Sequence, residues 1–399
     1  MITIKKVDSK NELLKFIKFP FKLYKNSKFW VPPIVDQEIE NFDKEKNPNI
    51  KQSKTNLFLA YKKSKVVGRI VAIINNYEVE VTKIKKIRFG WFDFIDDYEV
   101  SKKLLDKIDQ IGRENSLEFM EGPMGFTNLD KVGVLTSGFD KIGTMITTYN
   151  HEYYKKHFIK HQFVEEKKYH EKIFEFKNVD GKYYKQISDV VKQRNNLQEV
   201  TFTKTSEVLK RSNEMFDLFN DSYSKLSSFV KINEEQKEYM KKKYIKFINP
   251  EYIKFVQDEN KKLVAFAIVM PSFAWALQKI RGYLYPFGIF YLLYSKFFNK
   301  KINLYLIGIH PDYQKRGVTA IIFNSFIQTL KKKGIKICRR TPELIDNISV
   351  DKIWENFNQY DYFFGSANKR GGGGTPVRHN GESIATLKLI GKDLVTIQT

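Results

Sequence analysis

The chain carries one succession of predicted elements twice, and this repetition constrains its fold more than any other feature. Each copy consists of a β-hairpin, a strand, a helix and a further strand, in that order. The segments fall at residues 56–75, 87–98, 100–115 and 117–123 in the first copy, and at 252–271, 302–313, 318–333 and 335–343 in the second. This order predicts an α/β fold (an α+β mixed sheet) made of two tandem units.

The spacing between the two copies changes once. Val66 aligns with Leu263 at an offset of 197 residues, whereas Ile87 aligns with Ile302 at an offset of 215. The difference of 18 residues predicts an insertion in the second copy, at about Lys279–Lys300, which is rich in aromatic residues. These aromatics either pack against the first unit, or form a lid for a hydrophobic acyl chain or acceptor, or anchor the chain at a membrane interface.

Composition divides the chain further. Residues 177–200 are polar and lack apolar periodicity, so we expect one unit at residues 1–185 and a second at 186–364. Residues 365–399 contain no aromatic residue but hold seven of the 21 glycines. We therefore expect residues 365–399 to be a disordered or non-native extension. If that extension replaces a native ending, the last strand of the second unit is incomplete.

The main chemical signal lies where a strand runs into a helix in the second copy. The strand that ends at His310 is followed by a short loop with Gly317, and the helix begins near Val318. Free backbone N–H groups at a helix start bind anions, and a glycine lets the anion approach closely. Lys315 and Arg316 add positive charge beside these N–H groups. The pattern predicts a site for a pyrophosphate.

This arrangement resembles the acyl-coenzyme A loop of the GCN5-related N-acetyltransferases (the GNAT superfamily). Gln314 and Gly317 stand at the positions of its Gln-x-x-Gly motif, and Thr319 stands where the family usually has Gly or Ala. Residues 1–364 resemble a tandem-domain bacterial group of that superfamily, with Trp30-Val31-Pro32-Pro33 and Phe89-Gly90-Trp91-Phe92-Asp93 near the start. The resemblance implies acetyl-CoA or another acyl-CoA as co-substrate, and no metal. It implies cofactor contacts from Leu306, Ile307, Ile309, Gln314, Lys315, Arg316, Gly317, Val318 and Thr319.

The resemblance also implies direct transfer of the acyl group to the amine of an unknown acceptor, either a small molecule or a peptide. Such an enzyme removes a proton from the ammonium and returns one to the thiolate. His310 is a candidate base, although it also suits a residue that caps the loop. Glu343 is a candidate base acting through water, or a surface carboxylate. Tyr360 and Tyr362 are candidate acids because the superfamily often places its acid tyrosine in this region.

The first copy departs from this pattern. At the offset of 215, Glu99 aligns with Gln314 and Lys102 aligns with Gly317. The carboxylates of Asp96, Asp97 and Glu99 would repel a pyrophosphate. We therefore expect the first unit to lack the cofactor site and to serve as a scaffold or as a wall on the acceptor side.

Two other functions stay open. The formal net charge of +23 suits a transferase of the same fold that uses aminoacyl-tRNA, although such enzymes generally lack the Gln-x-x-Gly loop. Lys outnumbers Arg strongly, which is more typical of codon bias than of a specific nucleic-acid surface. A non-catalytic protein that binds acyl-CoA or a partner is the other alternative. The sequence leaves the oligomeric state open.

The sequence lacks paired cysteines and long apolar segments. The single cysteine, Cys338, excludes a disulfide framework and a multi-thiolate zinc site. No stretch reads as a signal peptide or a transmembrane span, so we expect a cytoplasmic protein.

Overall fold

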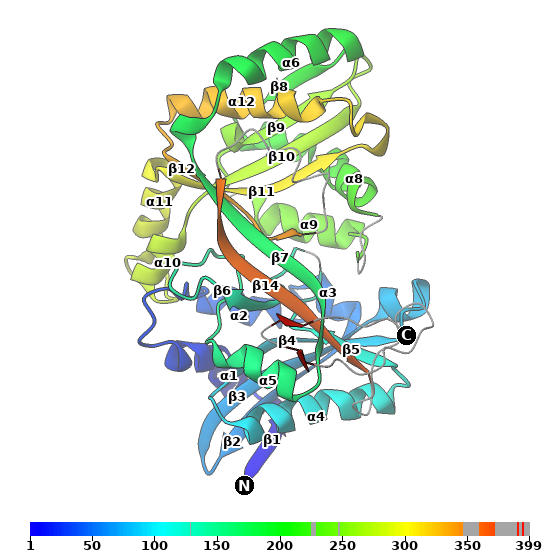
Figure 1. Cartoon of the computed structure of the whole chain (residues 1–399), viewed down its shortest axis with the longest axis vertical. Helices are drawn as coiled ribbons and strands as arrows, with labels where there is room; N and C mark the ends of the chain where they lie inside the picture. The colour runs from blue at the N-terminus through cyan, green and yellow to red at the C-terminus, as the bar shows by residue number, and fades with distance from the viewer. Residues whose placement is uncertain are drawn as a thin grey trace.

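The structure is a computed structural model that describes residues 1–127, 129–224, 229–245, 248–345 and 359–371, with two short strands beyond, β15 (Leu389–Ile390) and β16 (Asp393–Leu394). One mixed sheet runs through the molecule (Figure 1). Its strand order is β1 (Ile2–Lys6), β2 (Ser53–Lys62), β3 (Lys65–Asn75), β4 (Lys86–Phe94), β5 (Phe119–Gly122), β14 (Gln359–Gly371), β7 (Val164–Glu175), β12 (Ile337–Arg340), β11 (Lys301–Ile309), β10 (Leu263–Pro271), β9 (Ile253–Gln257) and β8 (Gln198–Thr201). Two further strands pair at the centre, β6 (Val134–Ser137) with β14 and β13 (Glu343–Leu344) with β7.

The two halves of the sheet repeat one topology, which confirms the predicted fold of two tandem units. In each half an antiparallel meander ends in a parallel pair, β4 with β5 and β11 with β12. The strand register preserves both sequence offsets. Gly68 pairs with Phe94, and Ala265, which is 197 residues after Gly68, pairs with Ile309, which is 215 residues after Phe94. Chance likeness between two α/β units would not preserve the register of paired strands.

Helices cover both faces of each half. The crossover helices α4 (Tyr98–Glu114) and α12 (Val318–Lys332) connect the parallel pairs, and α12 packs beside α6 (Gly181–Asn195). On the opposite face, α1 (Lys10–Leu23) packs on β3 and α8 (Ser212–Tyr223) packs on β11. The remaining α-helices are α2 (Val35–Asn41), α3 (Pro48–Lys51), α5 (Tyr153–Lys160), α7 (Thr205–Lys210), α9 (Glu234–Lys243), α10 (Ala274–Ile280) and α11 (Gly288–Phe298). The insertion predicted at about residues 279–300 thus contains α11 and the end of α10.

The two halves exchange their central strands. β7 follows the first half along the chain but pairs with β12 of the second half, while β14 follows the second half but pairs with β5 of the first. β7 and β14 also pair with each other along their length, and they cross the middle of the molecule side by side (Figure 1). Each half therefore completes its sheet with a strand from the other. The division near residue 185 stays a prediction.

The expectation that a non-native extension begins at Gly365 is wrong for residues 365–371, because they form the second part of β14. Ser366, Ala367 and Asn368 are buried there. A Cβ added to Gly365 would lie 3.1 Å from the Val134 carbonyl oxygen of β6, so the crossing of strands at this point favours small residues. For residues 365–371, the absence of aromatics agrees with this close packing. Of residues 372–399, the structure describes only the strands β15 and β16.

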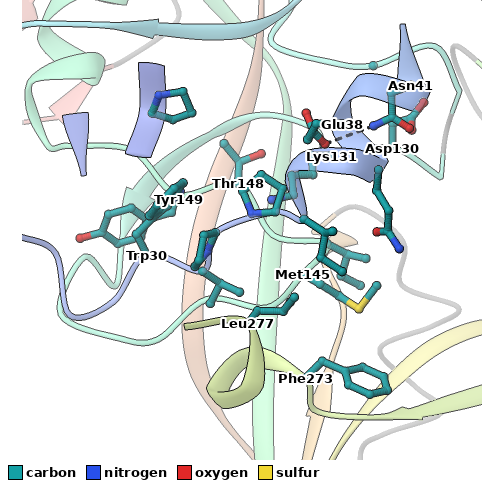
Figure 2. A pocket seen from close by; sticks show the side chains of 18 of the residues that line it. Trp30, Glu38, Asn41, Asp130, Lys131, Met145, Thr148, Tyr149, Phe273 and Leu277 are labelled. Atoms are coloured by element: carbon teal, nitrogen blue, oxygen red, sulfur yellow. Dashed lines mark hydrogen bonds between the residues drawn. The ribbon is translucent and has the colours of Figure 1, made fainter. Parts of the chain in front are cut away.

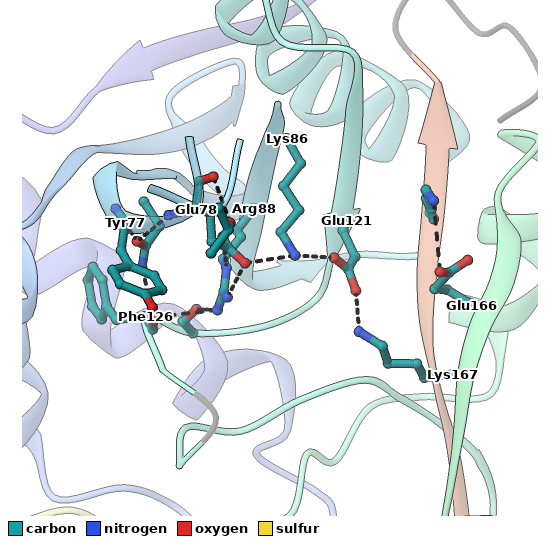
Figure 3. Close-up of polar contacts among 12 residues, drawn as sticks. Tyr77, Glu78, Lys86, Arg88, Glu121, Phe126, Glu166 and Lys167 are labelled. Atoms are coloured by element: carbon teal, nitrogen blue, oxygen red, sulfur yellow. Dashed lines mark hydrogen bonds and ion pairs between the residues drawn. The ribbon is translucent and has the colours of Figure 1, made fainter. Parts of the chain in front are cut away.

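A chain of buried ion pairs ties the first half to β7 (Figure 3). The Lys86 ammonium lies 2.8 Å from a Glu78 oxygen and 2.6 Å from a Glu121 oxygen, and the other Glu121 oxygen lies 2.9 Å from the Lys167 ammonium on β7. The Arg88 guanidinium contacts both oxygens of Glu78. Burial opposes ionisation of Glu121, but the ammonium groups of Lys86 and Lys167 lower its pKa to about 2. The network therefore carries its charges in the folded state.

Candidate functional site

β11 has an open edge beyond its short pairing with β12. The two strands pair only along Lys301–Leu304 of β11. Farther on, the His310 N–H donates to the Val264 carbonyl oxygen of β10 at 2.9 Å. Because backbone groups alternate along an antiparallel pair, Leu306 and Gly308 also face β10, whereas Ile307 and Ile309 face the open edge.

Side chains of the second half already bind the carbonyl groups on this edge. The Tyr223 hydroxyl donates to the Ile307 carbonyl oxygen at 2.8 Å. The Ile309 carbonyl oxygen accepts hydrogen bonds from Ser222 at 3.0 Å and from the Gln314 amide at 3.2 Å. The N–H groups of Ile307 and Ile309 point to the same side. The edge can therefore donate hydrogen bonds to an extended ligand laid beside β11.

The loop after β11 brings the predicted phosphate-binding residues to the start of α12. Lys315 and Gly317 both have positive φ, 64° and 76°, and α12 begins at Val318. Gly317 suits this left-handed conformation because it has no Cβ. Lys315, Arg316 and Gly317 are exposed, whereas Val318 is buried and Thr319 is half-buried. The first N–H groups of a fifteen-residue helix thus lie beside two exposed cations.

The corresponding places in the first half are filled by the protein itself. The Asp97 carboxylate accepts a hydrogen bond from the Glu99 N–H at the start of α4, at 3.0 Å. A hydrogen bond from Lys62 lowers the pKa of Asp97, so this carboxylate is ionised there. At the edge of β4, the Tyr153 hydroxyl donates to the Phe94 carbonyl oxygen, and the Tyr154 hydroxyl accepts from the Phe94 N–H at 3.1 Å. These contacts support the prediction that only the second unit binds a cofactor.

The candidate base His310 lies at the end of β11, where its side chain caps the loop. Its Nδ1 accepts a hydrogen bond from the Asp312 N–H at 3.3 Å. This contact agrees with the capping alternative. Glu343 lies in β13, where Arg340 donates to it at 3.0 Å. The pKa of Tyr223 is raised mainly by burial and secondly by the charge of Glu343. Glu343 therefore lies near the Tyr223 hydroxyl, which binds the edge of β11.

The two candidate acid tyrosines lie on β14. The Tyr362 ring stacks 4.2 Å from the Arg339 guanidinium, and its hydroxyl donates to the Ile142 carbonyl oxygen at 3.4 Å. Tyr360 pairs with Ile173, and its side chain is outside the description. Adjacent residues of a strand point to opposite faces of the sheet, so Arg339 and Arg340 do the same. Their partners, Tyr362 and Glu343, lie on opposite faces. The sheet therefore separates Tyr362 from Glu343, two of the four catalytic candidates.

A cavity of about 410 Å³ lies between the two halves, and sequence reasoning did not predict it. Apolar side chains such as Met145, Phe273 and Leu277 line one side, and polar side chains such as Glu38 and Asp130 line the other (Figure 2). Tyr305 also lines it, two residues before Ile307, so the cavity reaches β11 next to the open edge. The sequence signal that could have found it was the pair of segments at residues 30–33 and 89–93, since Trp30, Val31, Pro32, Pro33, Trp91, Phe92 and Asp93 all line it.

The carboxylates and amines on the polar wall of the cavity differ in their partners and burial. Asp93 is held by the Arg69 guanidinium at 2.7 Å and by the Tyr24 hydroxyl at 2.8 Å. Burial raises the pKa of the half-buried Asp130, and desolvation within the cavity wall lowers the pKa of Lys131, although that residue keeps an exposed surface and faces the opposing charges of Glu38 and Asp93. A carboxyl group and an amine shifted toward neutrality are suited to exchange protons with a bound molecule. Within the described residues, no group of three or more His, Cys, Asp or Glu side chains is placed to hold a metal ion.

Comparison with solved structures shows the fold. The tandem GNAT protein from the clavulanic acid biosynthesis pathway aligns with a TM-score of 0.54 over 94% of this chain and 99% of its own, at 8% identity. A GCN5-related N-acetyltransferase from Anabaena variabilis aligns with a TM-score of 0.51 over 93% of this chain and 72% of its own, at 8% identity. The class is therefore defined at the level of fold: the chain has the fold of the GNAT superfamily, in its tandem form.

The relatives found by sequence comparison are too distant to assign this chain to a family. No family model matches the chain. Protein YghO of Escherichia coli (strain K12) is 24% identical over 332 residues, which are 81% of this chain and 82% of that protein. The bacterial ceramide synthase of Caulobacter vibrioides is 28% identical over 130 residues, and these span only about a third of either chain (32% and 34%).

Proposed function

We propose that the protein is an acyl-CoA-dependent N-acyltransferase with one cofactor site, in its second half. The observation that carries this proposal is the difference between the two halves. In the described part of the second half, β11 and α12 offer an open strand edge and a helix start with adjacent cations, whereas the same places in the first half hold Tyr153, Tyr154 and Asp97. The Ile307 and Ile309 N–H groups would hold the extended arm and acyl group, and the loop from Lys315 to Thr319 would hold the pyrophosphate.

We further propose that the cavity holds the amine acceptor. The neutral amine attacks the thioester carbonyl, an N–C bond forms, the C–S bond breaks, and the amine proton is carried to the leaving thiolate. Asp130 and Lys131 on the polar wall are placed to handle protons, and the apolar wall suits an acceptor or acyl group with a long apolar part. One partial relative is named a ceramide synthase, and a ceramide is an N-acylated lipid amine. That name favours the same class of product here.

Calorimetric titration with acetyl-CoA and longer acyl-CoAs tests the cofactor site. We expect the wild-type chain to bind one equivalent, and Gly317→Asp to weaken binding at least about 100-fold, because it adds a negative charge and strains a residue at φ 76°. Gly334→Asp is the matched control, since Gly334 also has positive φ (64°) but lies at the other end of α12. No binding by the wild-type chain, or equal binding by Gly317→Asp, would contradict the assignment. Release of free CoA by the wild-type chain with an amine acceptor separates an enzyme from a binding protein.

A further inference from the structure

The hairpin of α10 and α11 exposes a concentration of large apolar side chains. Eleven of the seventeen large hydrophobic side chains that are exposed in the described part of the chain fall within residues 275–298. They include Tyr285 and Phe287, which are 82% and 69% exposed. Most are aromatic, and α11 carries them at Phe290, Tyr294 and Phe297, on successive turns. Exposure of this extent marks an interaction surface in a folded protein.

The base of this hairpin is fixed to the first half of the molecule. Val35 donates its N–H to the Gly282 carbonyl oxygen at 2.9 Å, and the Gln278 amide donates to the Trp30 carbonyl oxygen at 3.1 Å. Ala274, Leu277 and Ile280 are buried against Val31 and Ile34. The prediction that the aromatics of residues 279–300 pack against the first half is wrong, because these side chains are exposed, and small and aliphatic residues of α10 make that contact instead. Tyr291 and Tyr294 of α11 contact the Trp275 ring of α10, with ring centroids 5.6 and 5.7 Å apart, and the aromatics of α11 remain exposed.

The hairpin segment itself carries charge of one sign. Residues 272–301 contain no acidic residue and five basic ones, Lys279, Arg281, Lys296, Lys300 and Lys301. Lys18 of α1 lies 5.5 Å from the ring centre of Tyr283, which adds a cation beside the hairpin. An aromatic surface that carries cations is complementary to an apolar layer covered by anions.

We propose that the exposed aromatic face of α10–α11 docks this protein on the surface of an anionic lipid bilayer. Aromatic side chains favour the boundary between lipid headgroups and acyl chains, and Lys and Arg attract anionic headgroups. α11 has 11 residues, so it lies in the interface plane, since a span needs about 20 apolar residues. Among the described residues, no helix has both the length and the apolar character needed to cross a membrane.

The same hairpin forms the mouth of the cavity. Ile289 and Leu293 of α11 are exposed and also line the cavity, and Leu292 and Lys296 line it from the same helix. Docking of this face would place the cavity mouth against the lipid, so that a lipid-borne amine or acyl chain enters without passing through water. This consequence rests on the proposed function, whereas the docking itself does not.

Sedimentation of the full chain with vesicles tests the docking. We expect binding to vesicles of phosphatidylcholine with about a third of phosphatidylglycerol, and much weaker binding to pure phosphatidylcholine. The triple variant Phe290→Ser, Tyr294→Ser, Phe297→Ser should lose at least tenfold in vesicle affinity. The matched control is Val81→Ser, Ile159→Ser, Val190→Ser, three exposed apolar residues elsewhere, and it should bind like the wild-type chain. Circular dichroism melting checks that all chains fold.

The following outcomes would contradict the docking proposal. Failure of the wild-type chain to bind the anionic vesicles would overturn the proposal, as would equal binding by the aromatic triple variant. A dimer in light scattering that the triple variant converts to a monomer would show that a second copy covers the face, and this too would overturn it. Gly317→Asp should still bind vesicles, so a failed cofactor assignment and a failed docking proposal are distinguished.

Discussion

Glu121 is an acidic residue that is only 2% exposed, and it keeps its charge because two cations reach it. Burying a carboxylate without a partner is strongly unfavourable, whereas an ion pair in good geometry offsets much of that desolvation. Lys86 reaches Glu121 from the neighbouring strand β4, and Lys167 reaches it from β7, which is far away in the sequence. A single side chain thus joins the first meander to the exchanged strand.

We expect Glu121→Gln to lower the free energy of unfolding by about 3–5 kcal/mol, because the charges of Lys86 and Lys167 lose much of their compensation. Glu235→Gln is the control: it weakens the exposed pair with Lys51 and should change the stability by less than about 1 kcal/mol. Urea unfolding at neutral pH measures both variants. Equal midpoints would contradict the interpretation.

The lowered pKa of Glu121 predicts how the stability of the chain depends on pH. The pKa of Glu121 is about 2 in the folded chain and near its ordinary value of 4.5 when unfolded. Its contribution is therefore present above about pH 4.5 and is lost as the pH falls toward 2. The wild-type chain should lose more stability than Glu121→Gln over that interval.

At the scale of elements, β4 and β11 are corresponding strands whose open edges differ. Both diverge from their parallel neighbour after three or four residue pairs. On β4 the protein binds both backbone groups of Phe94 through tyrosines of α5. On β11 the side chains of α8 and the loop bind carbonyl oxygens, and the N–H groups face the edge. The corresponding strand edge is thus bound by protein side chains in the first half and can receive a ligand in the second.

We expect Tyr154→Phe to lower the free energy of unfolding by about 1–3 kcal/mol, because the buried Phe94 N–H loses its acceptor. Tyr285→Phe removes a hydroxyl from a residue that is 82% exposed and should have almost no effect. Denaturant titration of the two variants beside the wild-type chain gives the comparison. A Tyr154→Phe chain as stable as Tyr285→Phe would show that the hydroxyl does not stabilise the β4 edge.

At the scale of the whole molecule, the exchange of β7 and β14 makes the two halves depend on each other. The last residues of β14, Asn368–Gly371, pair with Gly122–Phe119 of β5. The sheet of the first half is therefore completed by residues that come almost 250 positions later. Neither half has its complete sheet without the other.

A chain that ends at Phe364 should therefore unfold at a lower temperature than a chain that ends at Gly371, because it lacks the residues that pair with β5 and the buried Ser366, Ala367 and Asn368. The first half should lose more of its hydrogen-exchange protection than the second. Calorimetry and hydrogen exchange on the two truncated chains test this. Identical melting of both chains would mean that this pairing contributes little.

The sequence by itself determined the local parts of this protein. The duplication, its offsets of 197 and 215, the insertion and the helix start after Gly317 follow from periodicity and turn residues, and the strand register agrees with them. Such features depend on neighbours along the chain, so they can be read without knowing the fold.

Only the tertiary structure decided the rest. The strand exchange, the place of residues 365–371 in β14 and the cavity all arise from contacts between distant segments. Asp130 and Lys131 carry no local motif, and their pKa shifts come from burial and from charges on other elements. The sequence located the aromatic insertion, but packing of α10 on the first half decided which side chains stay exposed, because burial is a property of the assembled molecule.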